Sequence, residues 1–339
     1  MLSDLVKSLL YRTGVLGAIH RWRNRRTLTV VMFHRVLAPT DPRWAGCDPD
    51  YTLDSRLFAD SLRFFRRHYS IVSAADVLAA TRDGAALPPR ALLITFDDGW
   101  ADTHDHALPA LREHAMPALL FAVADAIGRR QPFFQEQLIA AWRERRMTLA
   151  ALGSALHEQG IPNDAAAADD MDGLRRLISA LEAMDDAARE ALLARFHGAM
   201  DDRRRHMLDA NELNALQAGG VTIGVHGKTH RPLTRVDDLD AELSGARAIV
   251  ASLLDGQAPM TMSYPHGRHD EAIVARTFDA GYALAFTSVP GMNEVTPRPS
   301  RLLARLGFEQ SGISDAAGRF RPEWLALYLF RAPHRRLSA

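Results

Sequence analysis

The sequence predicts an α/β fold, an incomplete barrel of parallel strands that carries a helical insertion. Short apolar, β-branched runs alternate with helical patterns along most of the chain, and this alternation is typical of parallel sheets and α/β barrels. About seven such runs are present, which favours a barrel over a two-layer fold. The predicted strands are residues 27–33, 69–72, 91–96, 118–123, 221–225, 261–264 and 284–288.

Capping residues and apolar spacing predict helices between these strands. Asp54 is suited to cap one helix, and Ser73 is suited to cap a second helix that ends at Gly84. Residues 91–96 are almost continuously apolar, as expected of a strand buried on both faces. Further helices are predicted at residues 107–114, 238–254 and 270–280.

From about residue 130 to residue 217 the pattern is helical only, and it is rich in Ala, Leu, Asp and Arg. We interpret this stretch as an insertion between two barrel strands that forms a lid or a wall over one rim. A solvated helical hairpin without a functional role is the alternative. The predicted divisions are a basic amphipathic helix at 1–26, a barrel at 27–320 and a C-terminal tail at 321–339.

Composition narrows the class of protein. The 339 residues are 47% hydrophobic and 24% charged, which is typical of a globular protein and excludes disordered and collagen-like classes. The 41 basic residues balance 41 acidic residues, so no overall field indicates nucleic acid as a partner. Cys47 is the only cysteine, which excludes an intrachain disulfide and favours a reducing compartment. We therefore expect a cytoplasmic protein, with a peripheral membrane contact as a further possibility.

That possibility rests on the first 26 residues. Apolar side chains at helical spacing come first, and five arginines follow them, the reverse of the order in a signal peptide. The apolar residues are Leu2, Leu5, Val6, Leu9 and Leu10, and the arginines are Arg12, Arg21, Arg23, Arg25 and Arg26. We predict a basic amphipathic helix that either packs on the domain or contacts a membrane surface.

Two adjacent carboxylates, Asp97 and Asp98, follow the buried run 91–96 in the sequence Thr-Phe-Asp-Asp-Gly-Trp, which ends at Trp100. Barrels place their active sites at the carboxyl ends of the strands. Adjacent side chains diverge, so one carboxylate can bind a metal while the other faces a substrate. A plain Asp-Gly turn is the alternative interpretation.

His226 and His230 directly follow the predicted strand 221–225. Residues four apart share one face of a helical turn, so both imidazoles can reach one ion. With 14 histidines in the chain the spacing alone is weak evidence, but the strand end places the pair on the same rim as the aspartates. One carboxylate and two histidines form a three-ligand site typical of catalytic zinc.

A third motif, Ser-Tyr-Pro-His-Gly at residues 263–267, follows the next strand, and its Pro-x-Gly fixes a tight loop. The three motifs in this order resemble those of the polysaccharide deacetylase (NodB-homology) family, carbohydrate esterase family 4. The resemblance spans most of residues 27–308, includes the strand that runs into His34, and leaves out the insertion and both tails.

The resemblance implies a deformed (β/α)7 barrel that removes acyl groups from N-acylated sugars with the help of a divalent metal. By position, Asp98, His226 and His230 are the expected metal ligands, most simply of zinc, and Asp97 is the expected general base. The backbone N–H of His266 is expected to stabilise the oxyanion. The residues expected to contact the substrate are Trp100, Tyr264, Pro265 and Arg305.

The sequence departs from the family pattern in three places. Ser263 stands where many members carry an arginine that holds the catalytic aspartate, and His266 stands where a tyrosine is expected. The late motif that supplies a general-acid histidine reads Leu-Leu-Ala-Arg-Leu, with Arg305 and no histidine. His34 is therefore our first candidate for the general acid, and His266 is the second. Surface positions are expected for His104, His106 and His269.

These observations predict a metal-dependent enzyme that removes N-acetyl groups from a glycan or a lipid-linked sugar. A deformylase acting on a lipid-linked amino sugar is one alternative. A carbohydrate-binding barrel that has lost catalysis is another, which the missing late histidine favours.

Overall fold

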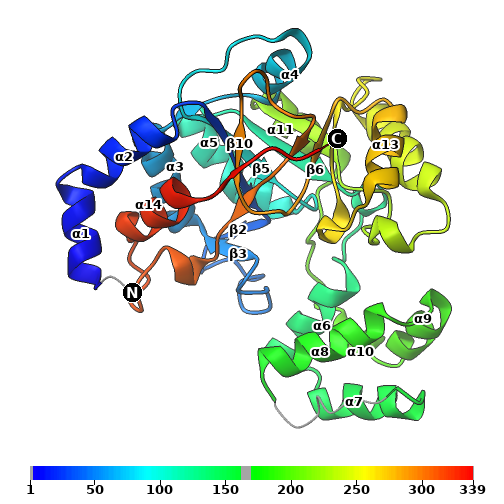
Figure 1. Cartoon of the computed structure of the whole chain (residues 1–339). Helices are drawn as coiled ribbons and strands as arrows, with labels where there is room; N and C mark the ends of the chain where they lie inside the picture. The colour runs from blue at the N-terminus through cyan, green and yellow to red at the C-terminus, as the bar shows by residue number, and fades with distance from the viewer. Residues whose placement is uncertain (1–2, 162–168, 339) are drawn as a thin grey trace. The chain divides into compact units, whose positions relative to one another are not determined.

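The computed structural model describes residues 3–161 and 169–338, and the chain divides into two compact units (Figure 1). The first consists of Met1–Pro39, Pro49–Arg129 and Met207–Ala339, and the second of Thr40–Asp48 and Arg130–His206. The strands of the first unit are β1 (Thr27–Phe33), β2 (Arg35–Leu37), β3 (Thr52–Asp54), β4 (Ser70–Ile71), β5 (Ala91–Phe96), β6 (Ala118–Ala122), β7 (Val221–Val225), β8 (Thr261–Ser263), β9 (Leu284–Phe286), β10 (Met292–Glu294), β11 (Leu302–Leu303), β12 (Leu306–Gly307) and β13 (His334–Arg335). Its α-helices are α1 (Asp4–Arg12), α2 (Val15–Arg23), α3 (Ser55–His68), α4 (Ala74–Asp83), α5 (Leu108–Glu113), α11 (Ala210–Ala218), α12 (Ala246–Leu253), α13 (Glu271–Asp279) and α14 (Pro322–Arg331).

Parallel strands close into a barrel in the first unit. Strands β9, β8, β7, β6, β5 and β1 lie in this order, and each pairs in parallel with the next. At the two ends of this row, β11 pairs with β9 and β12 pairs with β1. Only Ala304 and Arg305 separate β11 from β12, so residues 302–307 are one interrupted strand that joins both ends. The predicted (β/α)7 barrel is therefore confirmed.

The last barrel strand differs from the sequence prediction. The run at 69–72 was expected to be a barrel strand, but β4 pairs only with Ala91 and Leu92 at the start of β5. The remaining place in the barrel belongs to residues 302–307, which were not predicted as a strand. Each half of that strand is two residues long and Arg305 interrupts it, so no apolar period is visible in the sequence.

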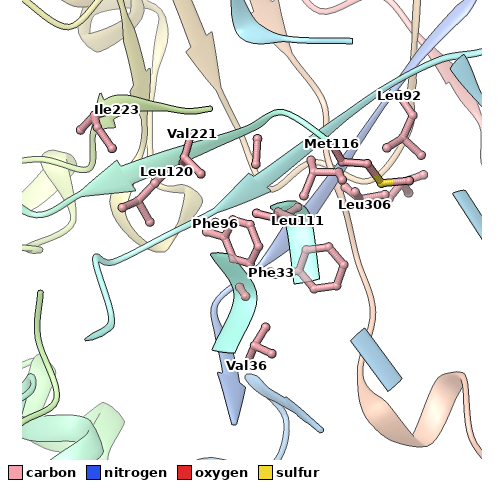
Figure 2. Close-up of a cluster of buried hydrophobic side chains, with 14 of the residues drawn as sticks. Phe33, Val36, Leu92, Phe96, Leu111, Met116, Leu120, Val221, Ile223 and Leu306 are labelled. Atoms are coloured by element: carbon pink, nitrogen blue, oxygen red, sulfur yellow. The ribbon is translucent and has the colours of Figure 1, made fainter. Parts of the chain in front are cut away.

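Alternate residues of the strands supply two apolar cores. Phe33 and Phe96 belong to a cluster that includes Leu111 of α5 (Figure 2). Leu93 and Phe121 belong to a second cluster, made by the opposite faces of the same strands. Every residue of β5 is buried, which explains its unbroken apolar run, and burial of each large side chain contributes about 1.5–3 kcal/mol. The barrel is thus a rigid support for the polar residues at its strand ends.

The second unit is helical and has its own core. Its helices are α6 (Phe134–Arg143), α7 (Leu149–Glu158), α8 (Met171–Glu182), α9 (Asp186–Ala194) and α10 (His197–Met200). Leu152, Leu177 and Leu181 are fully buried among them. The unit ends at His206 rather than near residue 217, because α11 packs its apolar side chains into the barrel core and leads into β7.

The two ends of the chain also differ from the prediction. Gly14, with a φ of +80°, divides the expected single N-terminal helix into α1 and α2. Residues 321–339 were expected to be a tail, but they contain α14, which buries Leu325 and Phe330 and packs against both N-terminal helices. The His20 ring of α2 stacks on Phe330, with 4.0 Å between the ring centroids. Within the described ranges, no helix combines the length and the apolar character needed to cross a bilayer.

Candidate functional site

Polar side chains meet at the carboxyl ends of the barrel strands. Asp97 and Asp98 follow β5, His226 follows β7, and His34 follows β1. Arg305 lies in the break between β11 and β12. The carboxyl ends of parallel barrel strands share one rim, so residues from four distant parts of the sequence are brought into one site.

Asp98, His226 and His230 form a compact cluster of potential metal ligands. One ligand atom from each residue lies within 4.8 Å of the other two. Oδ1 of Asp98 is 3.4 Å from Nε2 of His226 and 3.3 Å from Nε2 of His230. Ligands at about 2.0–2.1 Å from a tetrahedral zinc ion are roughly 3.3 Å apart. The residues present therefore fit a single ion of this kind.

The two histidines lie on a loop, and not on the helical turn that their spacing predicts. Gly227 and His230 have φ values of +73° and +66°, which are incompatible with a right-handed helix. The buried carboxylate of Glu242 accepts hydrogen bonds from the backbone N–H groups of Lys228 (2.7 Å) and Thr229 (3.1 Å). Glu242 thus folds the loop so that both imidazoles face the same carboxylate. Sequence reasoning missed this residue because it lies within an ordinary helical pattern.

Hydrogen bonds orient the ligand atoms. Nδ1 of His226 donates to the carbonyl oxygen of Ser263 at 2.8 Å, which leaves Nε2 to bind an ion. Burial lowers the pKa of His226 and favours the neutral imidazole, the form that binds metal. Nε1 of Trp100 donates to Oδ2 of Asp98 at 2.9 Å, so Oδ1 remains available. Burial alone would raise the pKa of Asp98, but its hydrogen bond and ionic contact with His230 hold that pKa well below its usual value.

Arg305 holds Asp97 by a bidentate ion pair. Both oxygens of Asp97 accept hydrogen bonds from the guanidinium, each at 2.7 Å, and both side chains are buried. The guanidinium also donates to Oγ of Ser263 at 2.7 Å and to the carbonyl of Thr287 at 2.9 Å. Burial would raise the pKa of Asp97, but the charge and hydrogen bonds of Arg305, together with the smaller effects of His226 and His34, lower that pKa. Arg305 was expected to contact the substrate; its contacts make it a positioning residue instead.

Trp100 was also expected to contact the substrate, but it is 2% exposed and lies behind Asp98. The Arg35 guanidinium carbon lies 4.3 Å from the centroid of its ring. Arg35 donates to Asp102 at 2.9 Å, and both of these side chains are buried. The chain of contacts from Asp102 through Arg35 and Trp100 fixes the Asp98 carboxylate. Sequence reasoning assigned no role to Arg35 or Asp102, because their ion pair joins residues that lie far apart in the sequence.

Tyr264 and Pro265, the other residues expected to contact the substrate, are buried. The Tyr264 hydroxyl donates to Oγ1 of Thr277 at 3.3 Å, and its ring stacks on that of His269. Cγ of Pro265 lies 3.1 Å from where a Cβ on Gly227 would be, so it packs against the loop that carries the two histidines. The structure therefore places both residues in packing contacts and not at an exposed surface.

His34 is half-buried and lines an open cleft of about 420 Å³. Its ring lies edge-on to Tyr51, with 4.8 Å between centroids. Its charge is one of those that lower the pKa of both Asp97 and Asp98, so the ring is within electrostatic reach of the cluster. The cleft is lined by Met32, Phe33, His34, Arg35, Asp50, Tyr51, Thr52, Leu53, Gly307, Phe308, Glu309, Ser311, Gly312 and Tyr328.

His266, the second candidate for the general acid, is less well suited. Its Nε2 lies 3.1 Å from the carbonyl oxygen of His230 and donates to it. Desolvation of the ring, together with the neighbouring His230 and His226, lowers the pKa of His266 to about 4. A neutral ring whose N–H is already engaged is a poor proton donor at neutral pH.

His104 belongs to a second group of potential ligands, with Asp105 and Glu212. Its Nδ1 lies 3.2 Å from Asp105 and 3.8 Å from Glu212. The Glu212 carboxylate already accepts the backbone N–H of Asp209 in the capping box of α11. The group is therefore explained by local helix capping.

The fold is a closed α/β barrel. Its rim carries a carboxylate and two imidazoles, with a second carboxylate held beside them, and this arrangement defines a hydrolase-like candidate metal site. A sequence model for polysaccharide deacetylases matches residues 84–285 of the chain, which is more than half of its length. The protein therefore belongs to the polysaccharide deacetylase family, as the three sequence motifs predict.

Known proteins agree with this assignment. YxkH of Bacillus subtilis (strain 168), which carries the family's name, is 37% identical over 49 residues; these cover 14% of this chain and only 18% of YxkH. The fold is that of the deacetylase PplD of Streptococcus pyogenes in complex with acetate (TM-score 0.56, 15% identity, 89% of this chain and 98% of PplD). IcaB of Ammonifex degensii is similar to the same degree (TM-score 0.56, 16% identity, 89% and 97%).

Proposed function

We propose that the protein is a metal-dependent hydrolase that removes N-acetyl groups from amino sugars of a glycan or glycan precursor. The observation that carries this proposal is a fixed, ionised Asp97 beside the cluster of Asp98, His226 and His230. One carboxylate and two imidazoles suit zinc best among the common divalent ions. A divalent ion bound there would supply Lewis-acid activation of water and of the amide carbonyl.

Asp97 is our candidate for the general base. Its Oδ2 is 3.9 Å from Nε2 of His226, so it borders the ligand cluster. The ion pair with Arg305 keeps the carboxylate ionised and prevents its rotation into the cluster as a further ligand. Asp97 can therefore accept a proton from the water that attacks the acetamide.

His34 is our candidate for the proton donor to the leaving amine, because it lines the cleft and acts electrostatically on both Asp97 and Asp98. The developing oxyanion needs a donor as well. The N–H groups of Gly267 and Arg268 donate within their own turn, whereas in the described ranges the N–H of His266 has no backbone acceptor. That N–H is our candidate oxyanion donor, and one such donor contributes about 3 kcal/mol to transition-state stabilisation.

The cleft beside His34 suits a neighbouring sugar. Tyr51 and Tyr328 offer aromatic surfaces, and Asp50 and Glu309 offer carboxylates that accept hydrogen bonds from sugar hydroxyls. An N-acetylated glycan or a lipid-linked amino sugar is therefore the proposed substrate class. The inactive-barrel alternative is less favoured, since Arg305 holds Asp97 ionised instead of leaving the site without a base.

Metal analysis combined with product release tests the proposal. Purified protein should bind one equivalent of zinc and release acetate from N-acetylated oligosaccharides. Asp98→Asn should lose the metal, whereas Asp97→Asn should keep it and lose turnover by about 10²-fold or more. Release of formate alone from a panel of N-acyl sugars would favour the deformylase alternative. A protein that binds oligosaccharides and metal but releases no acid would contradict the proposal.

A further inference from the structure

Helices α1 and α2, which we call the N-terminal helix pair, carry an unusual number of exposed apolar side chains. In the described part of the chain eight large apolar residues are exposed, and six of them lie in this pair. They are Leu5, Val6, Leu9, Val15, Ile19 and Trp22. Leu5 and Trp22 are each 84% exposed. Exposure of large apolar side chains to water is unfavourable, and clusters of them on a protein surface indicate an interaction site.

These side chains lie on the exposed sides of two helices that both pack against α14. Val15, Ile19 and Trp22 are spaced i, i+4 and i+7, so they share one face of α2. The opposite face of α2 is committed to the barrel unit through the buried Leu16 and His20. The exposed stripe is therefore a second apolar face, and not the core-facing side of a misplaced helix.

The same segment carries a strong positive charge. Six basic residues stand against one acidic residue between residues 3 and 26, a net charge of +5 in a chain whose overall charge is zero. Arg23 is one of the six, and its guanidinium donates to the carbonyls of Phe330 and Ala332, so it is structural. The exposed arginines are Arg12, Arg21, Arg25 and Arg26. Within the described residues none of these four forms an ion pair.

We propose that the N-terminal helix pair is a docking surface for an anionic lipid bilayer. Helices that lie in the membrane interface typically combine exposed leucine, isoleucine and tryptophan with unpaired arginines. Tryptophan in particular favours the headgroup region. A second copy of the chain is a poorer occupant, because a two-fold interface would place one +5 segment against another.

Docking in this way has a consequence for the substrate cleft. Helix α14 packs against both helices of the pair and also contributes Tyr328 to the cleft beside His34. The bilayer surface and the cleft are thus connected through one helix. An amino sugar carried on a membrane lipid would be presented to the site by this arrangement, whereas the docking surface itself does not depend on the proposed enzymatic activity.

Co-sedimentation of the full chain with vesicles tests the proposal. The chain should bind vesicles that contain phosphatidylglycerol and bind much more weakly to phosphatidylcholine alone. The double variant Arg12→Gln/Arg21→Gln should weaken binding about 30-fold, at roughly 1 kcal/mol per charge near the surface. The variant Leu9→Ser/Trp22→Ser changes only exposed side chains and should weaken binding at least about tenfold. The control Arg82→Gln/Arg176→Gln removes the same charge from exposed positions elsewhere and should bind as the wild type does.

Three results would overturn the proposal. The first is a wild type that remains in solution with anionic vesicles, and the second is equal sedimentation of all variants. The third is a dimer in solution that Leu9→Ser/Trp22→Ser dissociates, which would assign the surface to a second copy. Thermal melting of each variant, expected within a few degrees of the wild type, separates a binding defect from unfolding.

Discussion

Arg305 reaches from the break in the last barrel strand to Asp97 at the end of β5 and contacts both carboxylate oxygens at 2.7 Å. In the family pattern an arginine at the position of Ser263 has this task. Here Ser263 instead accepts a hydrogen bond from the same guanidinium. Ser263 in the third motif and Arg305 in the late motif therefore belong to one exchange. The arginine that pairs with Asp97 comes from a different motif, and the environment of the Asp97 carboxylate is preserved.

This exchange predicts the effect of replacing Arg305. In Arg305→Ala the buried Asp97 loses the main group that lowers its pKa, so burial raises that pKa against only the smaller effects of His226 and His34. The rate should fall about 10²-fold or more, and the acidic limb of the kcat/KM profile should move to higher pH, because the base becomes protonated sooner as pH falls. Stability should drop by about 3–5 kcal/mol, since a buried charge is left unpaired.

Arg305→Lys serves as the comparison variant. It keeps the charge but loses the two parallel hydrogen bonds, so its pH profile should move less than that of Arg305→Ala. A pH–rate profile unchanged in both variants would mean that Arg305 does not act through Asp97.

Much of the fold could be predicted from the sequence, because buried strands and helix caps leave local patterns. The strand ends also placed Asp97, Asp98, His226 and His230 on one rim. What the sequence did not reveal depends on tertiary contacts. The loop from His226 to His230 takes its shape from Glu242, which lies 12 residues beyond His230. The position of Arg305 depends on an interrupted strand whose two halves are each two residues long. Such partners have no local period or spacing that identifies them.

Trp100 provides a second prediction, on metal affinity. Its indole N–H fixes Oδ2 of Asp98 and so leaves Oδ1 directed at the two imidazoles. Trp100→Phe retains most of the buried volume but removes this donor, and loss of such a supporting hydrogen bond typically weakens metal binding by about 10–100-fold. Zinc titration against a competing chelator measures this effect. Equal affinity in Trp100→Phe and wild type would show that the indole N–H has no part in orienting the ligand.

The identity of the proton donor gives a third prediction. His34 faces the cleft, whereas the ring N–H of His266 is engaged by the carbonyl of His230. His34→Ala should therefore lower kcat by about 10²-fold or more with little change in metal content. His266→Ala keeps the backbone N–H and should have a smaller effect on kcat. The reverse order of effects would transfer the acid role to His266.

The last prediction concerns the buried His20, which anchors α2. Asn24 donates its side-chain amide N–H to the carbonyl of Phe330 and to Nδ1 of His20, while Nε2 of His20 donates to the carbonyl of His68. Both ring nitrogens are thus satisfied only in the neutral form, because a proton on Nδ1 would face a donor.

Burial lowers the pKa of His20 to about 3, whereas the usual pKa of histidine is about 6.5. The unfolded chain therefore binds a proton that the folded chain does not between these two values, so stability falls as pH decreases below about 6.5. At pH 5 the loss amounts to about 2 kcal/mol, or roughly 4–8 °C in Tm. His20→Gln should flatten the dependence of Tm on pH between 7.5 and 5, whereas His157→Gln, at an exposed position of the second unit, should leave it unchanged. Equal slopes in His20→Gln and the wild type would mean that another group carries the acid sensitivity.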